Sequence, residues 1–553
     1  MSKRSKSELE IDDVTQKIST FLSCAPNEQI IHRSKHIAYC VDAIYSLHRT
    51  SDSLAFVQPW VMYWNLHALD ILDAVHWAFG DTIEYGDWEK SCLGLDTSHC
   101  VSQTVRILVE CAASYPNKFK SDFSQELSAH SLDTFIRAGL DYDSHTVENG
   151  VLTRLKVRCK ECGISIDCVL AESTAVVAGL LIKHHRSCSP KCARAGMILP
   201  HRAEVLNAIQ SCFHTTIDQD PYSPGGYGGC QGQMPHLAST YAAVNSLLII
   251  GGTNYPDAYE AIHRESLQKW IDTLYNPQEG SFRMHADGEV DVRATYCALS
   301  VASLLNLKLK ALGAEATNGD GSTVSAGMKS IKQSKIVGFI KRCQTYEGGF
   351  SCTPFDEAHG GYSFCAMSVL LMLGKWNEAN LPLLRKWISQ RQCFTTGGFN
   401  GRTNKLVDAC YSFWIGSVVG LSEVAEAHNV SYSDDSNHTT YDLLRWIHLV
   451  PRDHNPNDTF DFARWSNVCC VDFRKLTNFL LSAAQDATKG GFRDKPWVRV
   501  DAYHTCYSLS GLAIAQRFLP DALWKLKDIN PIFNLCHDRV TSALLKFGGR
   551  GCI

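Results

Sequence analysis

The sequence lacks the features of several protein classes. Its longest apolar stretch lies near Ala175–Ile182, far shorter than the ~18–20 residues that cross a bilayer, so we expect no membrane span. Met1 is followed by charged and polar residues with no apolar run behind them, and we therefore expect no secretory signal. Lys and Arg (53) nearly cancel Asp and Glu (57), which excludes a strongly basic nucleic-acid binder.

Prolines are few (17), whereas aromatic residues are abundant, with 12 Trp and 23 Phe. Hydrophobic residues make up 45% of the 553 residues and charged residues 20%, which excludes disorder over the whole length. The 23 cysteines are odd in number and spread along a long chain, unlike those of a small disulfide scaffold. We therefore expect a reducing compartment and a cytoplasmic protein.

A glycine-rich turn followed by an aromatic residue recurs along the chain. The turns are Gly225-Gly226-Tyr227, Gly280-Ser281-Phe282, Gly348-Gly349-Phe350, Gly397-Gly398-Phe399 and Gly490-Gly491-Phe492. The aromatic residues are roughly 50–70 residues apart, with a last gap about twice the shortest, and such a period indicates repeated supersecondary units. Kelch propellers share this period, but they need four short alternating strands per repeat, and these segments do not alternate.

The segments between the turns have the composition of helices. Residues 238–250, 362–373 and 502–514 are rich in Ala, Leu and small residues and apolar on most faces, so these helices must be buried in a larger assembly. More polar, amphipathic stretches such as Leu381–Gln392 follow them. Two helices per repeat, one inner and one outer, predict an all-α fold: an α-α barrel of about six helical hairpins.

The spacing of the glycine turns also suggests domain limits. We predict an N-terminal helical extension at 1–55, the barrel at 56–80 and 203–525, an insertion of uncertain structure at 81–202, and a C-terminal tail at 526–553. Within the insertion, two cysteine pairs resemble zinc knuckles: Cys159, Cys162, Cys188 and Cys192. The pairs are about twenty-five residues apart, longer than usual for a zinc ribbon, so ordinary thiols are the favoured interpretation.

Asp408 and Cys410 follow one glycine turn, and His504 follows another. Residues i and i+2 of a regular helix point apart, so one metal ion joins Asp408 and Cys410 only if they lie at a helix start. In a closed barrel the starts of the inner helices meet at one rim. Asp, Cys and His there would form a three-ligand zinc site with an open position. An isolated Asp-x-Cys is far more often structural, so the spacing alone leaves both interpretations open.

Cationic residues are expected at the same rim, and aromatic residues are expected in the interior of the barrel. Helix starts add partial positive charge, and four side chains there suit a diphosphate: Arg293, His359, Arg402 and Lys405. Salt bridges with nearby Asp and Glu are the alternative. Seven aromatic residues would line the interior, suiting an isoprenoid chain, or form plain core: Trp60, Tyr63, Trp64, Tyr241, Tyr296, Tyr362 and Trp414.

These blocks resemble the β subunit of protein farnesyltransferase. The matching stretches are 59–64, 233–245, 288–293, 346–350, 357–365, 397–414 and 501–507. The 397–414 block, Gly-Gly-Phe-Asn-Gly-Arg-Thr-Asn-Lys-Leu-Val-Asp-Ala-Cys-Tyr-Ser-Phe-Trp, is the most specific. The resemblance implies a zinc-dependent transfer of farnesyl from farnesyl diphosphate to the cysteine of C-terminal CaaX proteins, by a heterodimer with a separate α subunit.

The resemblance also implies roles for individual residues. The family's zinc ligands fall on Asp408, Cys410 and His504, and the position linked to magnesium falls on Asp494. Its diphosphate pocket falls on His359, Arg402, Lys405 and Tyr411. Positions that hold the farnesyl chain fall on Arg293, Tyr362, Cys365 and Trp414. The CaaX peptide would lie on Trp60, Trp64, His236, Ala238 and Tyr503.

The sequence departs from the family at a few places. Ser239 stands where proline is usual beside the peptide's last residue, and Val498 and Val500 stand where basic residues are common. A geranylgeranyltransferase β subunit is the nearest alternative, but Trp60 and Asp494 speak against it. A terpene cyclase would need a DDxxD or DCTAE motif, and a non-catalytic scaffold would have no use for Asp, Cys and His at one rim.

Overall fold

The computed structural model of the chain describes residues 6–24, 30–47, 55–75, 79, 140–148, 151–159, 165–169, 202–214, 225–252, 255–312, 326–431, 470–519, 522 and 524–548. The chain forms two compact units. One consists of Met1–Phe79 together with Pro200–Ile553, and the other is Gly80–Leu199.

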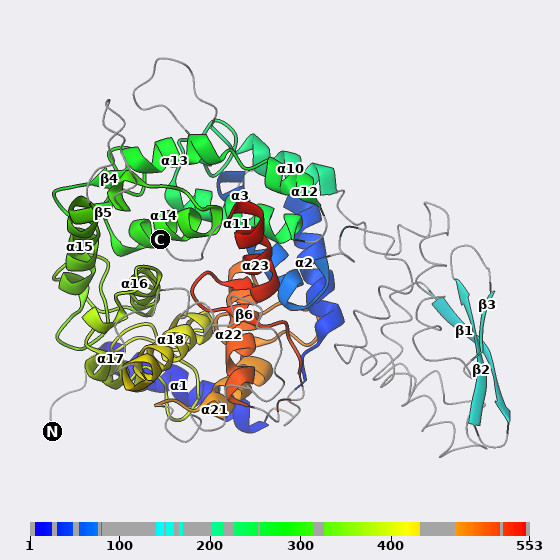
Figure 1. The fold of residues 1–553 in the computed structure, drawn as a ribbon. Helices are drawn as coiled ribbons and strands as arrows, with labels where there is room; N and C mark the ends of the chain where they lie inside the picture. The colour runs from blue at the N-terminus through cyan, green and yellow to red at the C-terminus, as the bar shows by residue number, and fades with distance from the viewer. Residues whose placement is uncertain are drawn as a thin grey trace, which may run out of the picture. The chain divides into compact units, whose positions relative to one another are not determined.

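In the larger unit, six of the described helices form an inner ring (Figure 1). They are α3 (Gln58–Ile71), α11 (Leu237–Gly251), α14 (Val292–Leu305), α16 (Gly360–Met372), α18 (Tyr411–Ser431) and α22 (Ala502–Phe518). Each packs against the next in chain order, and α22 packs against α3, which closes the ring. The inner helices are apolar because they have almost no solvent-facing side: in α11, every residue but Ala238 is buried.

An outer helix precedes each inner helix. The outer helices are α2 (Arg33–Leu47), α10 (Arg202–Ser211), α13 (Arg264–Thr273), α15 (Ala326–Cys343), α17 (Leu381–Ser389) and α21 (Phe473–Asn478), which continues as the π-helix η5 (Phe479–Ala484). These helices are amphipathic: α17 buries Leu381, Leu384, Trp387 and Ile388 at helical spacing. The predicted all-α barrel of about six hairpins is confirmed.

The glycine turns attach each hairpin to the next one. A Cβ atom on the first glycine would lie closer than 3.0 Å to a main-chain carbonyl oxygen of an outer helix, where no side chain fits. The pairs are Gly225 with Ser266, Gly280 with Lys335, Gly348 with Leu383, Gly397 with Lys475, and Gly490 with Lys35. Four of these glycines also have positive φ, from 76° to 111°, a conformation that L side chains rarely adopt.

The last of these pairs closes the barrel. Gly490 precedes the final inner helix, yet it packs on Lys35 of α2, the first outer helix. The same docking that joins consecutive hairpins therefore joins the two ends of the ring.

The C-terminal segment packs into the barrel. It contains the two-stranded hairpin β6 (Ile529–Asn530) and β7 (Leu535–Cys536), followed by helix α23 (His537–Phe547). Three inner-helix tyrosines donate hydrogen bonds of 2.8 Å to consecutive carbonyls of this segment: Tyr296 to Ile532, Tyr241 to Phe533, and Tyr63 to Asn534. The buried carboxylate of Asp70 in α3 pairs with Arg539 at 2.7 Å and with Lys527 at 3.1 Å.

Further elements complete the larger unit. They are α1 (Lys6–Cys24), η1 (Ala55–Val57), α12 (Pro256–Glu260), β4 (Tyr275–Asn276) paired with β5 (Ser281–Phe282), η3 (Lys310–Leu312) and η4 (Trp376–Glu378). Among the described helices, none is both long enough and apolar enough to cross a membrane.

The smaller unit contains an antiparallel sheet of three strands in the order β1-β2-β3. The strands are β1 (Leu140–Glu148), β2 (Val151–Cys159) and β3 (Ser165–Val169). Cys159 ends β2, whereas Cys162, Cys188 and Cys192 lie outside the described residues. The choice between zinc knuckles and ordinary thiols therefore also lies outside the described residues. The domain limits drawn from the sequence stay a prediction.

Candidate active site

The candidate site is built from the residues that cap the inner helices. One capping residue follows the aromatic residue of each glycine turn by nine positions: His236, Asp291, His359, Asp408 and Asp501. Each side chain accepts a hydrogen bond from a main-chain N–H two or three residues later, as N-cap residues do. Because the turns repeat around the barrel, these polar side chains all occur at the starts of the inner helices.

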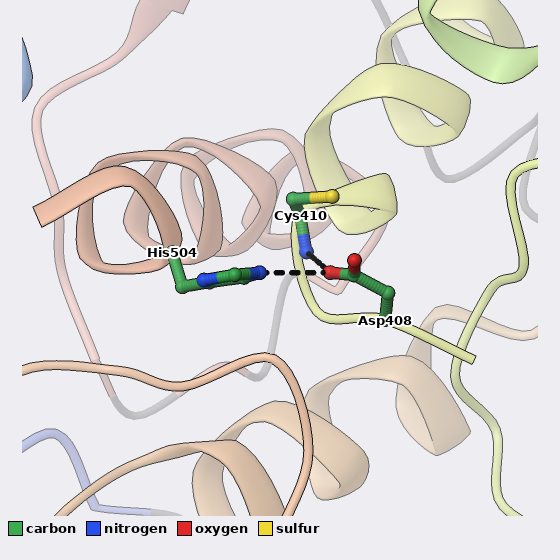
Figure 2. A group of neighbouring side chains, drawn as sticks. All are labelled: Asp408, Cys410 and His504. Atoms are coloured by element: carbon green, nitrogen blue, oxygen red, sulfur yellow. Dashed lines mark hydrogen bonds and ion pairs between the residues drawn. The ribbon is translucent and has the colours of Figure 1, made fainter. Parts of the chain in front are cut away.

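Three of the predicted residues come together as a possible metal-binding group (Figure 2). Asp408 and Cys410 immediately precede α18, and His504 lies in the first turn of α22. One ligand atom from each residue lies within 4.8 Å of the other two. The Asp408 carboxylate accepts the main-chain N–H of Cys410 at 2.8 Å and faces His504 Nε2 at 3.2 Å. Asp408 and Cys410 are thus outside the regular helix, as their spacing required.

The Asp408 carboxylate sets the protonation of its two neighbours. Burial alone would lower the pKa of His504, but the carboxylates of Asp408 and Asp501 raise it to about 9. Burial, with Asp408 beside it, holds the pKa of the Cys410 thiol well above its ordinary value. Without a metal the histidine is therefore the charge that balances Asp408, and a divalent cation would take over that role and favour the thiolate.

A second layer holds these three residues in place. Asp501 accepts a hydrogen bond from His504 Nδ1 at 2.6 Å, which leaves Nε2 directed at Asp408. A carboxylate on the outer nitrogen is the usual support of a metal-binding histidine. The main-chain N–H of Ala409 donates to the carbonyl oxygen of Asp494 at 2.9 Å, which ties the Asp408–Cys410 segment to the loop before α22.

One other group among the described residues has metal-ligand atoms close together: Asp70, Cys536 and Asp538. Lys527 and Arg539 already form ion pairs with Asp70. These two cations neutralise the carboxylates, so the group fastens the C-terminal segment to the barrel and has no charge left for a metal ion.

The predicted diphosphate-binding residues lie next to the metal-binding group. His359 Nε2 is 3.0 Å from the hydroxyl of Tyr411, the first residue of α18. Burial, with Arg402 nearby, lowers the pKa of His359 to about 4, so the ring is neutral. Arg402 pairs with Glu357 at 2.8 Å, as the salt-bridge interpretation predicted. Both partners are more than 40% exposed, and such pairs are weak enough to exchange for another anion.

Lys405 lies apart from these contacts. It lines a cavity of about 490 Å³ together with Thr403, Asn404 and residues of α1. No contact with His359 or Tyr411 is found for Lys405 in the described part of the chain, so its place in a diphosphate site stays a prediction.

The residues predicted for the farnesyl chain lie on α14, α16 and α18. Arg293 is held by Asp291 at 2.6 Å and lies 5.8 Å from the ring centre of Tyr362. Cys365 is buried one turn after Tyr362. Trp414 is 5.2 Å from Phe364, which connects it to the aromatic residues of the neighbouring helices.

The residues predicted for the peptide lie on α3, α11 and α22. The ring centres of Trp60 and Trp64 are 5.4 Å apart with the planes tilted by 31°, and Trp64 and Tyr503 are in an edge-to-face contact with ring centres also 5.4 Å apart. Tyr503 accepts a hydrogen bond from Trp414 Nε1 at 3.1 Å, which joins the peptide and farnesyl sets. His236 caps α11 by accepting the N–H of Ala238 at 3.2 Å.

Asp494, the predicted magnesium position, already has a cation beside it, because Lys495 forms an ion pair with its Oδ2. Its other oxygen, Oδ1, is buried without a hydrogen-bond partner among the described residues. Burial, with Asp408 nearby, raises the pKa of Asp494. The unpaired oxygen is the feature that fits a further cation.

The sequence did not single out the supporting carboxylates Asp291 and Asp501. A signal for both was present, because each follows its turn aromatic by nine residues, the same interval that separates Phe399 from Asp408. The sequence analysis also did not identify Lys495 as the partner of Asp494. The only indication in the sequence was that the two residues are adjacent.

Comparison with known proteins gives a family. The model of the prenyltransferase α-α toroid domain matches residues 31–118 and 195–535. The chain is 37% identical to protein farnesyltransferase subunit beta of Pisum sativum over 59% of its length and 80% of the pea protein. It is also 37% identical to the Arabidopsis thaliana protein of that name, over 53% of the chain and 60% of the relative.

Geranylgeranyl transferases are more distant. The type-1 subunit beta of Arabidopsis thaliana is 34% identical over 34% of the chain and 46% of the relative. Among solved structures, Candida albicans protein geranylgeranyltransferase-I complexed with GGPP matches 95% of the chain and 100% of that chain at 17% identity, with a TM-score of 0.45.

Proposed function

Because this chain belongs to the protein farnesyltransferase β-subunit family, we propose that it is the catalytic subunit of a cytoplasmic protein farnesyltransferase. The reaction joins the farnesyl group of farnesyl diphosphate to the cysteine thiol of a C-terminal CaaX protein. The observation that carries the proposal is the group of Asp408, Cys410 and His504 at the start of two inner helices. The thirteen described cysteines that are free thiols support a reducing compartment.

The donor set fits zinc. One carboxylate, one thiolate and one imidazole, with Asp501 behind the imidazole, are the ligands that a catalytic zinc ion takes, and they leave a fourth position open. When bound, zinc would lower the pKa of a substrate thiol in that position, so that the substrate reacts as thiolate. Asp408 supplies negative charge, and Cys410 must lose its proton for the ion to bind.

The hydrogen bonds of His359 direct the proton of Tyr411. His359 Nδ1 accepts the main-chain N–H of Gly361 at 3.1 Å, so in the neutral ring Nε2 carries the proton and donates to the oxygen of Tyr411. The Tyr411 hydroxyl proton is then free to donate to an oxygen of the leaving diphosphate. Arg402, released from Glu357, and Lys405 would balance the charge that develops there.

Aromatic side chains form the apolar surface of the proposed site. Trp414, Tyr362 and the buried Cys365, with Arg293 at the rim, would hold the farnesyl chain, and Trp60, Trp64, His236, Ala238 and Tyr503 would contact the peptide. Magnesium at the unpaired oxygen of Asp494 would assist departure of the diphosphate, in competition with Lys495.

An α subunit is part of the proposal. Large aromatic side chains are exposed on the segments that lead into the inner helices: Tyr346, Phe355, Phe394 and Trp497, with exposures of 63–102%. Apolar groups that gather at one rim are typical of a protein interface, and the α subunit of the family is the partner proposed to cover them.

The test is Cys410→Ala, with the chain expressed with and without a farnesyltransferase α subunit. We expect the variant to lose stoichiometric zinc, measured by elemental analysis, and CaaX-peptide farnesylation, while binding of farnesyl diphosphate stays intact because the lipid contacts lie elsewhere. The matched control is Cys343→Ala, which removes an equally buried thiol from the outer helix α15. Full zinc occupancy in Cys410→Ala would refute the site, and full activity of the chain alone would refute the partner.

A further inference from the structure

A histidine occupies a position where the other hairpins carry an apolar residue. In each outer helix that receives a glycine turn, the residue after the contacted carbonyl points into the core. Four of these residues are buried and apolar: Leu267, Ile336, Leu384 and Leu476. In α2 the residue is His36, which is 0% exposed. A buried imidazole needs hydrogen-bond partners that leucine does not need, so packing alone does not account for it.

The hydrogen bonds of Gln485 determine how His36 is protonated. Gln485 Nε2 donates to the carbonyl oxygens of Ile30 at 3.0 Å and Leu481 at 3.1 Å, so its Oε1 is the atom that faces His36 Nε2 at 2.8 Å. His36 Nε2 therefore carries the proton. His36 Nδ1 is then the acceptor for the main-chain N–H of Gly491 at 2.9 Å. The ring is neutral, and its burial lowers the pKa to about 4.

The Gly491 N–H belongs to the loop that leads into α22. The next residue, Phe492, stacks on the His36 ring with 4.7 Å between ring centres. The carbonyl oxygen of Phe492 accepts the N–H of Asp501 at 3.2 Å, and Asp501 holds His504 by its Nδ1. Three consecutive contacts thus connect His36 to the histidine of the metal-binding group.

The same loop supports the other two residues of that group. The carbonyl oxygen of Asp494, midway along the loop, accepts the N–H of Ala409 at 2.9 Å. Ala409 stands between Asp408 and Cys410, so a shift of the loop would move both. The loop after the turn that His36 contacts therefore supports residues that hold all three candidate ligands.

We propose that His36 is a positioning residue of the metal site. By accepting the Gly491 N–H from the first outer helix, it fixes the start of the loop 491–501 and thereby holds the three ligands at the spacing that zinc requires. The inference rests on the proposed zinc site. Removing a group that orients metal ligands without binding the metal itself typically changes the metal affinity by about 10–100-fold.

The test is His36→Leu, because leucine is the residue that three other outer helices already bury at this position. We expect the dissociation constant for Zn²⁺ to rise about tenfold, measured by competition with a chelator on the purified complex of the chain with its α subunit. Co²⁺ in place of zinc should show an altered visible spectrum, since ligand angles change. His36→Asn restores an acceptor for Gly491 and should recover most of the affinity.

Two comparisons separate positioning from general packing. Leu384→Val perturbs the equivalent position of α17 and should lower the melting temperature without changing the Zn²⁺ dissociation constant. If His36→Leu does not fold, His36→Gln, which keeps a donor for Gln485 but offers Gly491 no acceptor, should still bind Zn²⁺ more weakly than His36→Asn.

Unchanged zinc affinity in the His36 variants, or an equal loss in Leu384→Val, would overturn the inference and leave the proposed function standing. A wild-type complex that binds no zinc would instead overturn the proposed function, and the inference with it.

Discussion

At the scale of single residues, one position of the repeat serves two purposes. His236, Asp291, His359 and Asp501 all cap an inner helix, a role that contributes about 1 kcal/mol. Asp408 occupies the same position, nine residues after its turn aromatic, but it also faces His504 of the next inner helix. A side chain that is structural in one hairpin becomes a candidate ligand in another because of the neighbour that the closed ring places beside it.

Trp60 is the residue for which we predict control of lipid length. Its ring lies 6.1 Å from Tyr63, 5.4 Å from Trp64 and 6.0 Å from Tyr241, so its bulk occupies the aromatic interior. We expect Trp60→Thr to shift preference from farnesyl toward geranylgeranyl diphosphate by roughly 10–200-fold, the range set by added or removed apolar volume in a pocket. The measurement is kcat/KM for both lipids with one CaaX peptide.

Trp376→Thr, on the outer element η4, is the control and should leave the ratio of the two lipids unchanged. An unchanged ratio in a Trp60→Thr variant that folds and binds zinc would assign length control to another residue.

At the scale of elements, the turn between an outer and an inner helix makes the contact that attaches one hairpin to the next. Each first glycine approaches a carbonyl oxygen of the adjoining outer helix too closely for any side chain. The second glycine of three of these turns lies against an aromatic ring: Gly226 on Trp270, Gly349 on Trp387 and Gly398 on Phe479. The repeated glycines are therefore required by contacts between hairpins as well as by the bend within one.

Gly348 and Gly420 form a matched pair for testing this requirement. Gly348 has φ of +111° and faces the carbonyl of Leu383, whereas a Cβ on Gly420, within α18, would meet nothing within 4 Å. We expect Gly348→Ala to lower the free energy of unfolding by about 1–3 kcal/mol, as strained backbone does. Gly420→Ala should raise it by about 0.5–1 kcal/mol, because alanine favours a helix.

Denaturant unfolding of the two variants measures both free energies. Equal effects of the two substitutions would show that the turn does not require glycine.

At the scale of the whole molecule, the barrel is complete without the segment between its first two hairpins. Helices α3 and α11 pack directly against each other, although Gly80–Leu199 separates them in the chain as a compact unit of its own. None of the candidate site residues belongs to that unit. Since a long surface excursion adds little closure entropy, the ring does not depend on the length of this connection.

We therefore expect that a short Gly/Ser linker in place of residues 85–198 keeps farnesylation within about tenfold of the full chain, because the loop-closure term changes slowly with length. The measurement is kcat/KM of the complex with its α subunit, together with zinc content. A folded, zinc-bound deletion without activity would show that the segment contributes to the site.

The sequence by itself determined the repeat and the class of fold. Apolar inner segments and the five glycine turns follow from burial on all sides and from close contact with a carbonyl, and these are requirements that composition and period express directly. The matching blocks also identified Asp408, Cys410 and His504 as one group, although the spacing of Asp408 and Cys410 alone left the structural interpretation open.

Only the tertiary structure decided which partners these residues have. His504 on Asp408, Glu357 on Arg402 and His36 on Gly491 are contacts between hairpins, and His36 is 455 residues from Gly491. A local pattern carries no information about such pairs, because they exist only when the ring places separate hairpins side by side. The His36 pair requires in addition that the last turn docks on the first outer helix.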